Sequence, residues 1–165
     1  MSYSPIQWPE NKQDLYHLLH QQMHALAEAT PLPSLCNCSA LLWDALRDIN
    51  WCGFYLLRDQ TLILGPFQGK IACTSIPVGR GVCGTAAATR DIQLVPDVHA
   101  FPGHIACDSA SNSEIVIPMV KDGLLLGVLD IDSPLKSRFD DQDAAGLAEI
   151  VRILLDKTDW THGLL

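Results

Sequence analysis

Apolar side chains near the start of the chain recur every three or four positions, which is the period of an amphipathic helix. We therefore expect a helix over residues 13–30, and we expect Pro31 and Pro33 to stop it because proline cannot continue a helix. Ser34 is a suitable N-cap for a second helix, which would present Leu35, Leu42 and Leu46 to the core. The apolar positions of the first helix are Leu15, Leu18, Leu19, Met23 and Leu26.

The middle of the chain contains short aromatic and aliphatic runs that predict β-strands. Two pairs of runs are each separated by only two turn-forming residues, Asp59-Gln60 and Asp122-Gly123, so each pair predicts a β-hairpin. Both residues of the second turn tolerate a positive φ, which a tight turn requires. The runs are residues 50–58 with 61–65, and residues 114–121 with 124–132.

The remaining segments predict two more helices, one strand and one loop. Residues 81–90 are rich in small side chains and predict a short helix, and residues 92–95 predict a strand. Residues 98–113 form a polar segment that is long for a compact domain, and such loops often carry function. Asp140 can cap a final helix in which Leu147, Val151 and Leu154 recur at three- and four-residue spacing.

The order of these elements predicts the fold class. Hairpins dominate the connections between strands, so we expect a mostly antiparallel sheet with helices packed on it, an α+β domain. We expect residues 1–165 to form this single domain, with residues 1–12 as a flexible N-terminal segment.

Composition narrows the class of partner. Hydrophobic residues make up 48% of the 165 residues and charged residues 18%, which is typical of a globular protein. The formal net charge of −8 argues against nucleic acid or an anionic membrane surface as partner, because both would repel the protein. A small zwitterion carries no net charge, so the negative charge of the protein would not repel it.

The chain has six cysteines, and whether they are expected to form disulfides depends on the cellular compartment of the protein. The first residues contain no basic start and no apolar stretch of signal-peptide length, and no later run approaches the ~20 apolar residues of a membrane span. We therefore expect a cytoplasmic protein, in which cysteines are more often buried, metal-binding or catalytic than bridged.

Three of the cysteines lie in runs of glycine or small residues, and acidic residues follow them. Glu114 comes shortly after the third cysteine, and Asp130 and Asp132 lie in the run LDIDS. Thiols that pass electrons, together with carboxylates that carry a proton or hold a cation, suggest redox chemistry on a small polar substrate. The cysteine runs are residues 68–73 (QGKIAC), 79–84 (GRGVCG) and 104–107 (HIAC).

These motifs, in this order, resemble the free methionine-(R)-sulfoxide reductases, which are stand-alone GAF-domain enzymes. The resemblance extends from about Leu35 to the last helix, and it implies a six-stranded antiparallel sheet flanked by helices. The matching segments are residues 65–73, 79–84, 104–107, 113–116 and 127–133.

The resemblance also implies a role for each thiol. Cys107 would attack the sulfoxide sulfur, giving free methionine and a cysteine sulfenic acid. Cys73 would condense with that sulfenic acid to a disulfide, with Cys83 as an auxiliary thiol, and thioredoxin would reopen the bond. No bound cofactor or metal is implied, and relatives form homodimers.

The acidic and aromatic residues would bind the substrate. By the same resemblance, Glu114, Asp130 and Asp132 would hold the α-ammonium of a free amino acid, and one of them would stay protonated to serve as a general acid. Trp51 would form an aromatic wall around the methylsulfinyl group, and Tyr55 falls on the same face of that strand.

Two other classes of function remain open at the level of sequence. One is a regulatory GAF module that binds a small ligand without catalysis. The other is a zinc protein with His104, Cys107, Cys73 and Cys83 as ligands, since His-x-x-Cys is a plausible metal spacing. Taken singly, each of these cysteines also suits a buried structural thiol. The remaining cysteines, Cys36, Cys38 and Cys52, are expected to be non-catalytic.

Overall fold

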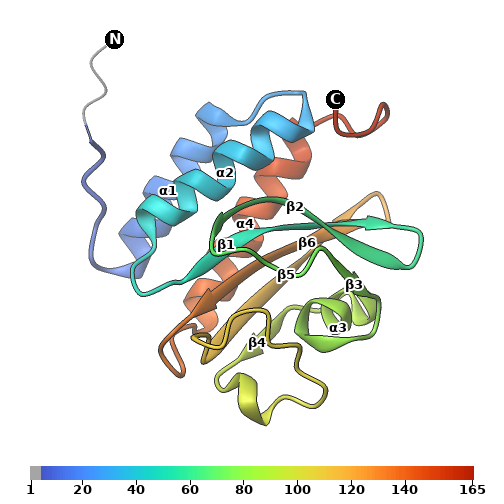
Figure 1. The fold of residues 1–165 in the computed structure, drawn as a ribbon. Coiled ribbons are helices and arrows are strands. Elements are labelled where there is room, and N and C mark those ends of the chain that lie inside the picture. The colour runs from blue at the N-terminus through green and yellow to red at the C-terminus, as the bar shows by residue number, and fades with distance from the viewer. Residues whose placement is uncertain (1–4) are drawn as a thin grey trace.

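The computed structural model describes residues 5–165 as one six-stranded sheet with helices on both faces (Figure 1). The helices are α1 (Lys12–Leu26), α2 (Pro31–Ala45), α3 (Gly81–Thr89) and α4 (Asp141–Lys157), and Val98–Ala100 form a 3₁₀ turn. The strands are β1 (Trp51–Arg58), β2 (Thr61–Gly69), β3 (Ser75–Pro77), β4 (Gln93–Val95), β5 (Ser113–Lys121) and β6 (Leu124–Ser133).

All neighbouring strands in the sheet are antiparallel, in the order β3-β2-β1-β6-β5-β4. The predicted α+β class and the six antiparallel strands are therefore confirmed. Both predicted hairpins are present, and Asp122 and Gly123 in the second turn have φ values of 51° and 76°. The two hairpins meet where β1 pairs with β6 at the centre of the sheet.

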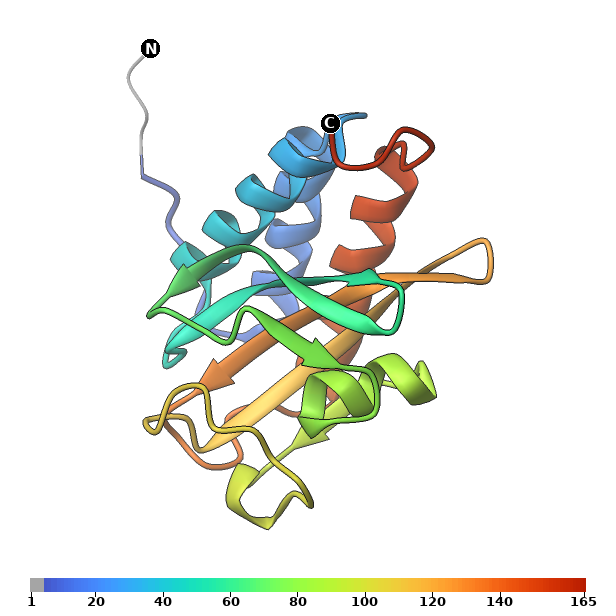
Figure 2. The same cartoon turned by 45° about the vertical axis from the view of Figure 1, so that its right-hand side comes forward.

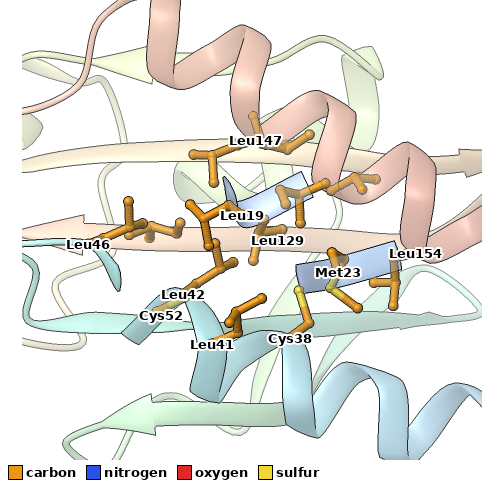
Figure 3. Close-up of a cluster of buried hydrophobic side chains, with 14 of the residues drawn as sticks. Leu19, Met23, Cys38, Leu41, Leu42, Leu46, Cys52, Leu129, Leu147 and Leu154 are labelled. Carbon is orange, nitrogen blue, oxygen red and sulfur yellow. The ribbon is translucent and has the colours of Figure 1, made fainter. Parts of the chain in front are cut away.

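The two faces of the sheet are covered differently (Figures 1 and 2). Helices α1, α2 and α4 lie together on one face, whereas α3 and the segment between β4 and β5 lie on the other. Side chains alternate along a strand, so Cys52, Leu129 and Ile131 point into the helix-covered core (Figure 3). The residues between them in the sequence point to the opposite face, which carries the candidate site.

The boundary between the first two helices differs from the prediction. Helix α1 ends at Leu26, and Pro31 begins α2 instead of only stopping α1. Proline suits the first turn of a helix because its missing N–H would have no partner there. Ser34 is consequently inside α2, where its hydroxyl bonds both the backbone N–H and the carbonyl of Glu28.

The sequence pattern also predicted a first hairpin shorter than the one observed. Strand β2 continues to Gly69, four residues beyond the predicted end, and the three-residue β3 was not predicted. A strand this short contains too few positions for its alternation to be recognised. The extension is important for the site because it brings Cys73, just after β2, alongside β1.

The predicted flexible segment of residues 1–12 lies partly outside the described residues, which begin at residue 5. Within the described part, the Trp8 indole packs against the core and donates a hydrogen bond to Asp44. Asn11 caps α1 by accepting a hydrogen bond from the backbone N–H of Asp14. Among residues 5–165, no helix combines the length and the hydropathy needed to cross a membrane.

Candidate active site

The alternation of the central strands places the predicted acidic and aromatic residues on one face. Trp51 on β1 pairs with Asp132 on β6, and Asp132 in turn pairs with Glu114 on β5. Asp130 and Tyr55 belong to the same face, two and four positions further along their strands. All five side chains line one pocket, so the structure brings these predicted residues together.

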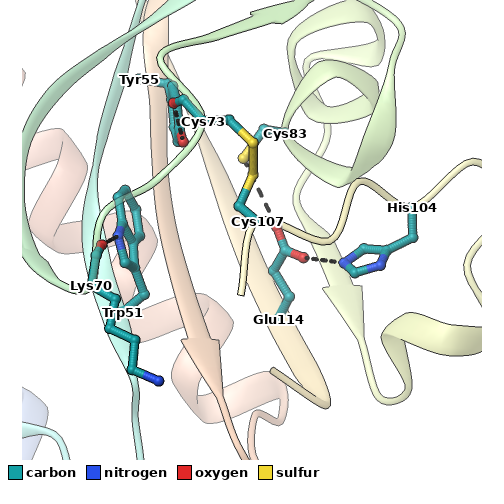
Figure 4. The surroundings of a disulfide bond; sticks show 8 residues. All are labelled: Trp51, Tyr55, Lys70, Cys73, Cys83, His104, Cys107 and Glu114. Carbon is teal, nitrogen blue, oxygen red and sulfur yellow. Dashed lines mark hydrogen bonds and ion pairs between the residues drawn. A yellow bond between two sulfur atoms is a disulfide. The ribbon is translucent and has the colours of Figure 1, made fainter. Parts of the chain in front are cut away.

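The predicted thiols reach this face from three different segments. Cys83 is on α3, which packs over β5 and β6. Cys73 follows β2, and Cys107 lies in the segment between the 3₁₀ turn and β5. Cys73 and Cys107 are joined in a disulfide with a Cα–Cα distance of 5.8 Å, and the buried thiol of Cys83 lies beside it (Figure 4).

The glycines around Cys83 explain how α3 approaches the sheet so closely. A Cβ atom on Gly84 would lie 2.6 Å from the carbonyl oxygen of Pro77, too near for any larger residue. Gly79 and Gly81 have φ values of 87° and 62°, a conformation that L side chains rarely adopt. The glycine-rich motif thus lets the chain turn from β3 into α3 and set Cys83 against the carboxylates.

The two aromatic residues of the pocket hold the segment that carries Cys73. The Trp51 indole donates a hydrogen bond to the carbonyl of Lys70 at 3.2 Å, and the Tyr55 hydroxyl donates to the carbonyl of Cys73 at 2.9 Å (Figure 4). The Trp51 ring stacks on both Tyr55 and Phe67, at centroid distances of 5.7 and 5.2 Å. These contacts are additional to the predicted role as an aromatic wall.

Within residues 5–165, no lysine or arginine side chain neutralises the three carboxylates. Among the described residues, no lysine or arginine forms an ion pair with Glu114, Asp130 or Asp132, and one oxygen of Asp130 has no hydrogen-bond partner. Burial, followed by repulsion from the neighbouring acids, raises the pKa of Glu114 and Asp132 well above their usual range. Burial also raises the pKa of Asp130, to about 6. The pocket therefore favours protonated carboxyls, or a bound cation.

Glu114 also lies next to a thiol and an imidazole. The Cys83 thiol donates to one carboxylate oxygen at 3.9 Å, and His104 Nε2 lies 3.8 Å from the other (Figure 4). Burial and nearby Asp130 and Glu114 raise the pKa of Cys83, which keeps it a thiol at neutral pH. Burial, with some repulsion from His99, lowers the pKa of His104. Since a neutral imidazole faces a carboxyl of raised pKa, this contact is a polar one rather than a strong ion pair.

Asn50 supports the pocket from outside its lining, and the sequence pattern did not predict this role. Its side-chain amide donates to Asp108 at 3.1 Å and to Ser111 at 3.0 Å, and its backbone N–H donates to the carbonyl of Asp132. Asn50 thus ties the segment that carries Cys107 to the start of β1. Nothing in the local sequence signals this, because the three partners are 58, 61 and 82 residues away.

The pocket is small when the disulfide is closed. Its volume is about 40 Å³, room for only a few water molecules at ~15 Å³ each. Two of the four residues of the alternative zinc site are bonded to each other in the disulfide. Elsewhere in the pocket, Cys83, Glu114 and Asp130 offer ligand atoms within 4.8 Å of one another, the one group in residues 5–165 with a geometry able to hold a metal ion.

The other cysteines lie away from the pocket. Cys38 and Cys52 are fully buried in the helix-covered core, where burial raises the pKa of both thiols, to about 12 for Cys38 (Figure 3). Cys36 is exposed on α2.

Comparison with known proteins identifies the class and then the family. A GAF domain model matches residues 14–154, so the six-stranded sheet and its pocket define a GAF domain. The free methionine-R-sulfoxide reductase of Escherichia coli (strain K12) is 58% identical over 155 residues, which cover 91% of this chain and 94% of that protein. The chain therefore belongs to the free methionine-R-sulfoxide reductase family, and the resemblance seen in the motifs is confirmed.

Solved structures agree with this assignment. The free methionine-R-sulfoxide reductase from Neisseria meningitidis in complex with its substrate is 41% identical, with a TM-score of 0.89 over 94% of this chain and 95% of that chain. The enzyme abbreviated fRMsr of Staphylococcus aureus, in its reduced form, is 54% identical, with a TM-score of 0.84 over 86% of this chain and 94% of that chain. These matches do not favour either a purely regulatory module or a zinc protein.

Proposed function

We propose that this protein reduces free L-methionine (R)-sulfoxide to L-methionine, using its own thiols as the electron source. The observation that carries the proposal is the Cys73–Cys107 disulfide beside a pocket of three carboxylates that no lysine or arginine of the described residues neutralises. A bond between the two cysteines is the oxidised product of such a reaction. The relatives whose names state this activity support it.

The carboxylates suit the charged end of a free amino acid. Glu114, Asp130 and Asp132 would share the α-ammonium of the substrate, which supplies the positive charge that the pocket lacks. Trp51 and Tyr55 would pack against the methylsulfinyl group. A peptide-bound methionine sulfoxide has an amide in place of the ammonium, so the carboxylates would remain unpaired and the peptide would be rejected.

The chemistry takes two steps. The Cys107 thiolate attacks the sulfoxide sulfur while a protonated carboxyl, for which Glu114 has a suitably raised pKa, gives its proton to the sulfoxide oxygen. The substrate S–O bond then breaks, the hydroxyl is transferred to the Cys107 sulfur as a sulfenic acid, and methionine leaves. The Cys73 thiol then attacks the sulfenic sulfur, which forms the disulfide and releases water.

Recycling is obligatory in this scheme. Both the attacking and the resolving thiol are consumed in the disulfide, so the bond must be reduced before the next turnover. We propose thioredoxin as the reductant, the cytoplasm as the compartment and a homodimer as the assembly, with no bound cofactor and no role for nucleic acid or a membrane. Cys83 would be a slow auxiliary thiol, since its raised pKa disfavours the thiolate.

The decisive experiment is a turnover assay with separated R and S epimers of free methionine sulfoxide and thioredoxin as reductant. We expect consumption of the R epimer alone. Equal consumption of both epimers, or of neither, would refute the assignment.

Cysteine variants separate attack from recycling. Cys107→Ser should give no methionine even in a single turnover of pre-reduced enzyme, because a hydroxyl is a far poorer nucleophile towards sulfur. Cys73→Ser should give about one methionine per site and then stall with thioredoxin. Quench-flow measurement of methionine, with mass analysis of Cys107, reads both outcomes. A full burst from Cys107→Ser together with none from Cys73→Ser would reverse the two roles.

A further inference from the structure

Each bonded cysteine ends the same tripeptide, Ile-Ala-Cys, at residues 71–73 and 105–107. The isoleucine of each copy is exposed to solvent. Ile71 is 91% exposed, the largest value among the exposed large hydrophobic residues in the described chain, and Ile105 is 37% exposed. Both isoleucines line the pocket that Cys107 of the disulfide also lines.

A single exposed hydrophobic side chain is ordinary on a protein surface and needs no explanation. Here, however, the disulfide joins the two segments, so both isoleucines, with the exposed Ala106, gather around one reactive bond. Ile105 is held in place because it packs on Gly81 at the start of α3, where an added Cβ would approach it to 3.1 Å. We call Ile71, Ile105 and Ala106 the isoleucine patch.

Two basic side chains border the isoleucine patch, and its acidic neighbour Asp108 already accepts hydrogen bonds from Asn50 and from the backbone of Ala110. Lys70 precedes Ile71, and Arg80 lines the same pocket; both are exposed. Neither forms an ion pair with any of the residues 5–165, although the chain has 19 acidic residues and a net charge of −8. An apolar surface with a basic border is complementary to a partner with an apolar surface and an acidic border.

We infer that the isoleucine patch is the docking surface for a protein dithiol that reduces the Cys73–Cys107 disulfide. This inference rests on the proposed function, which requires that bond to be reopened after every turnover. A protein reductant must bring its own thiol into line with a sulfur of the bond, and an apolar contact on both sides of the bond fixes that approach. A small dithiol needs no such contact.

The exchange is balanced in electrons and protons. The partner thiolate attacks the sulfur of Cys107, the more exposed of the two residues, and Cys73 leaves as a thiolate that takes up a proton. The second thiol of the partner attacks the mixed disulfide and releases Cys107. Two electrons and two protons thus pass from the partner dithiol to the two cysteines, and the partner leaves as a disulfide.

The test measures reduction of the oxidised protein directly, without methionine sulfoxide. Ile71→Ser should lower the second-order rate constant for reduction by thioredoxin about tenfold, which corresponds to about 1.4 kcal/mol, while the rate with dithiothreitol changes less than twofold. Ile71→Leu should restore most of the thioredoxin rate. Leu124→Ser is the matched control, since Leu124 is 67% exposed at the opposite end of the β5–β6 ladder.

The outcomes are distinguishable from those of the function assay. Equal loss with thioredoxin and dithiothreitol would mean that Ile71 acts on the bond itself, and no loss with either would mean that it contacts no partner; both results overturn the inference. A thioredoxin variant without its resolving cysteine should be trapped on Cys107, and trapping on Cys73 instead would overturn the assignment of the attacked sulfur. If the epimer assay shows no reductase activity, the rates of disulfide reduction by thioredoxin and dithiothreitol can still be measured. The two proposals are therefore tested separately.

Discussion

Asp143 and Asp130 are both buried carboxylates, but they lie on opposite sides of the sheet and have opposite surroundings. Asp143, on α4, accepts hydrogen bonds from Lys12, from the Tyr16 hydroxyl at 2.8 Å and from the backbone, and Arg138 lies 3.5 Å away. Asp130 has an oxygen without a partner and shares its pocket with three more acids, Asp108, Glu114 and Asp132. Asp143, which stabilises the fold, has its partners within the chain, whereas Asp130, which we propose binds the substrate, has an oxygen without one.

The two faces of the sheet differ in the same way as these two carboxylates. The helix-covered face is filled by apolar side chains in contact with one another (Figure 3). The opposite face combines a second apolar cluster and the three carboxylates with the Cys83 thiol and the disulfide, and Figure 4 shows these last two beside Glu114. Burying unpaired acids lowers stability, so we expect the first face to determine how stable the protein is and the second to determine what it does.

The largest expected effect is on activity. Glu114→Gln and Asp132→Asn should each lower kcat/KM for the R epimer about a thousandfold, roughly 4 kcal/mol, because a charge for the ammonium and a proton donor are lost with little change in volume. The free energy of unfolding should not fall in either variant. Steady-state kinetics and urea denaturation check both statements, and full kcat/KM in both variants would remove these residues from the site.

The next effect is on stability and concerns the helix-covered side. Asp143→Asn should lower the free energy of unfolding by about 3 kcal/mol, because Lys12 and Arg138 lose a buried counter-charge. The activity of the folded enzyme should change little. The matched control is Asp141→Asn, an exposed residue in the same first turn of α4, which should be close to neutral in urea denaturation. A large loss of kcat/KM in Asp143→Asn would show that the two faces are not separable.

The third prediction concerns pH. The pKa of Asp130 is raised from 3.8 to about 6, so the folded state holds the proton more strongly than the unfolded state. Its stabilising contribution is therefore complete below about pH 4 and is lost as pH rises through about 6, a change on the order of 3 kcal/mol.

Urea midpoints at pH 4.5 and 7.5 measure this effect on the oxidised protein without substrate. Asp130→Asn should reduce the loss of stability between the two pH values, and the variant should be more stable than the original protein at pH 7.5. Identical pH dependence in the original and in Asp130→Asn would show that this carboxyl does not carry the effect.

The smallest effect is expected on stability, for the surface ion pairs of α4. Arg152 on α4 forms surface ion pairs with Glu149 and Asp156; Arg152 and Asp156 are exposed to solvent and Glu149 is partly exposed. Exposed pairs of this kind contribute little because water and salt screen them. Arg152→Ala should therefore shift Tm by less than about 2 °C in a thermal melt. A larger shift would mean that surface charge on α4 also stabilises the fold.

Much of the site could be predicted because it depends on alternation. Trp51 and Tyr55 on one strand, and Asp130 and Asp132 on another, are separated by even numbers of residues, which puts each pair on one face of its strand. The motifs around the cysteines added the thiols. Asn50 and Arg80 could not be found in this way, since their importance depends on segments that approach them only in the folded chain.

The sequence by itself determined the period of each long element, both tight turns and the cap of α4, because these depend on a few neighbouring residues. The tertiary structure decided where α1 ends and α2 begins, that β2 runs on into the segment carrying Cys73, and that β3 exists at all. It also decided the raised pKa values of the carboxyls, because desolvation is set by everything that packs over a group. Local patterns fix which way a side chain points, whereas its distance from water and from other charges is a property of the whole fold.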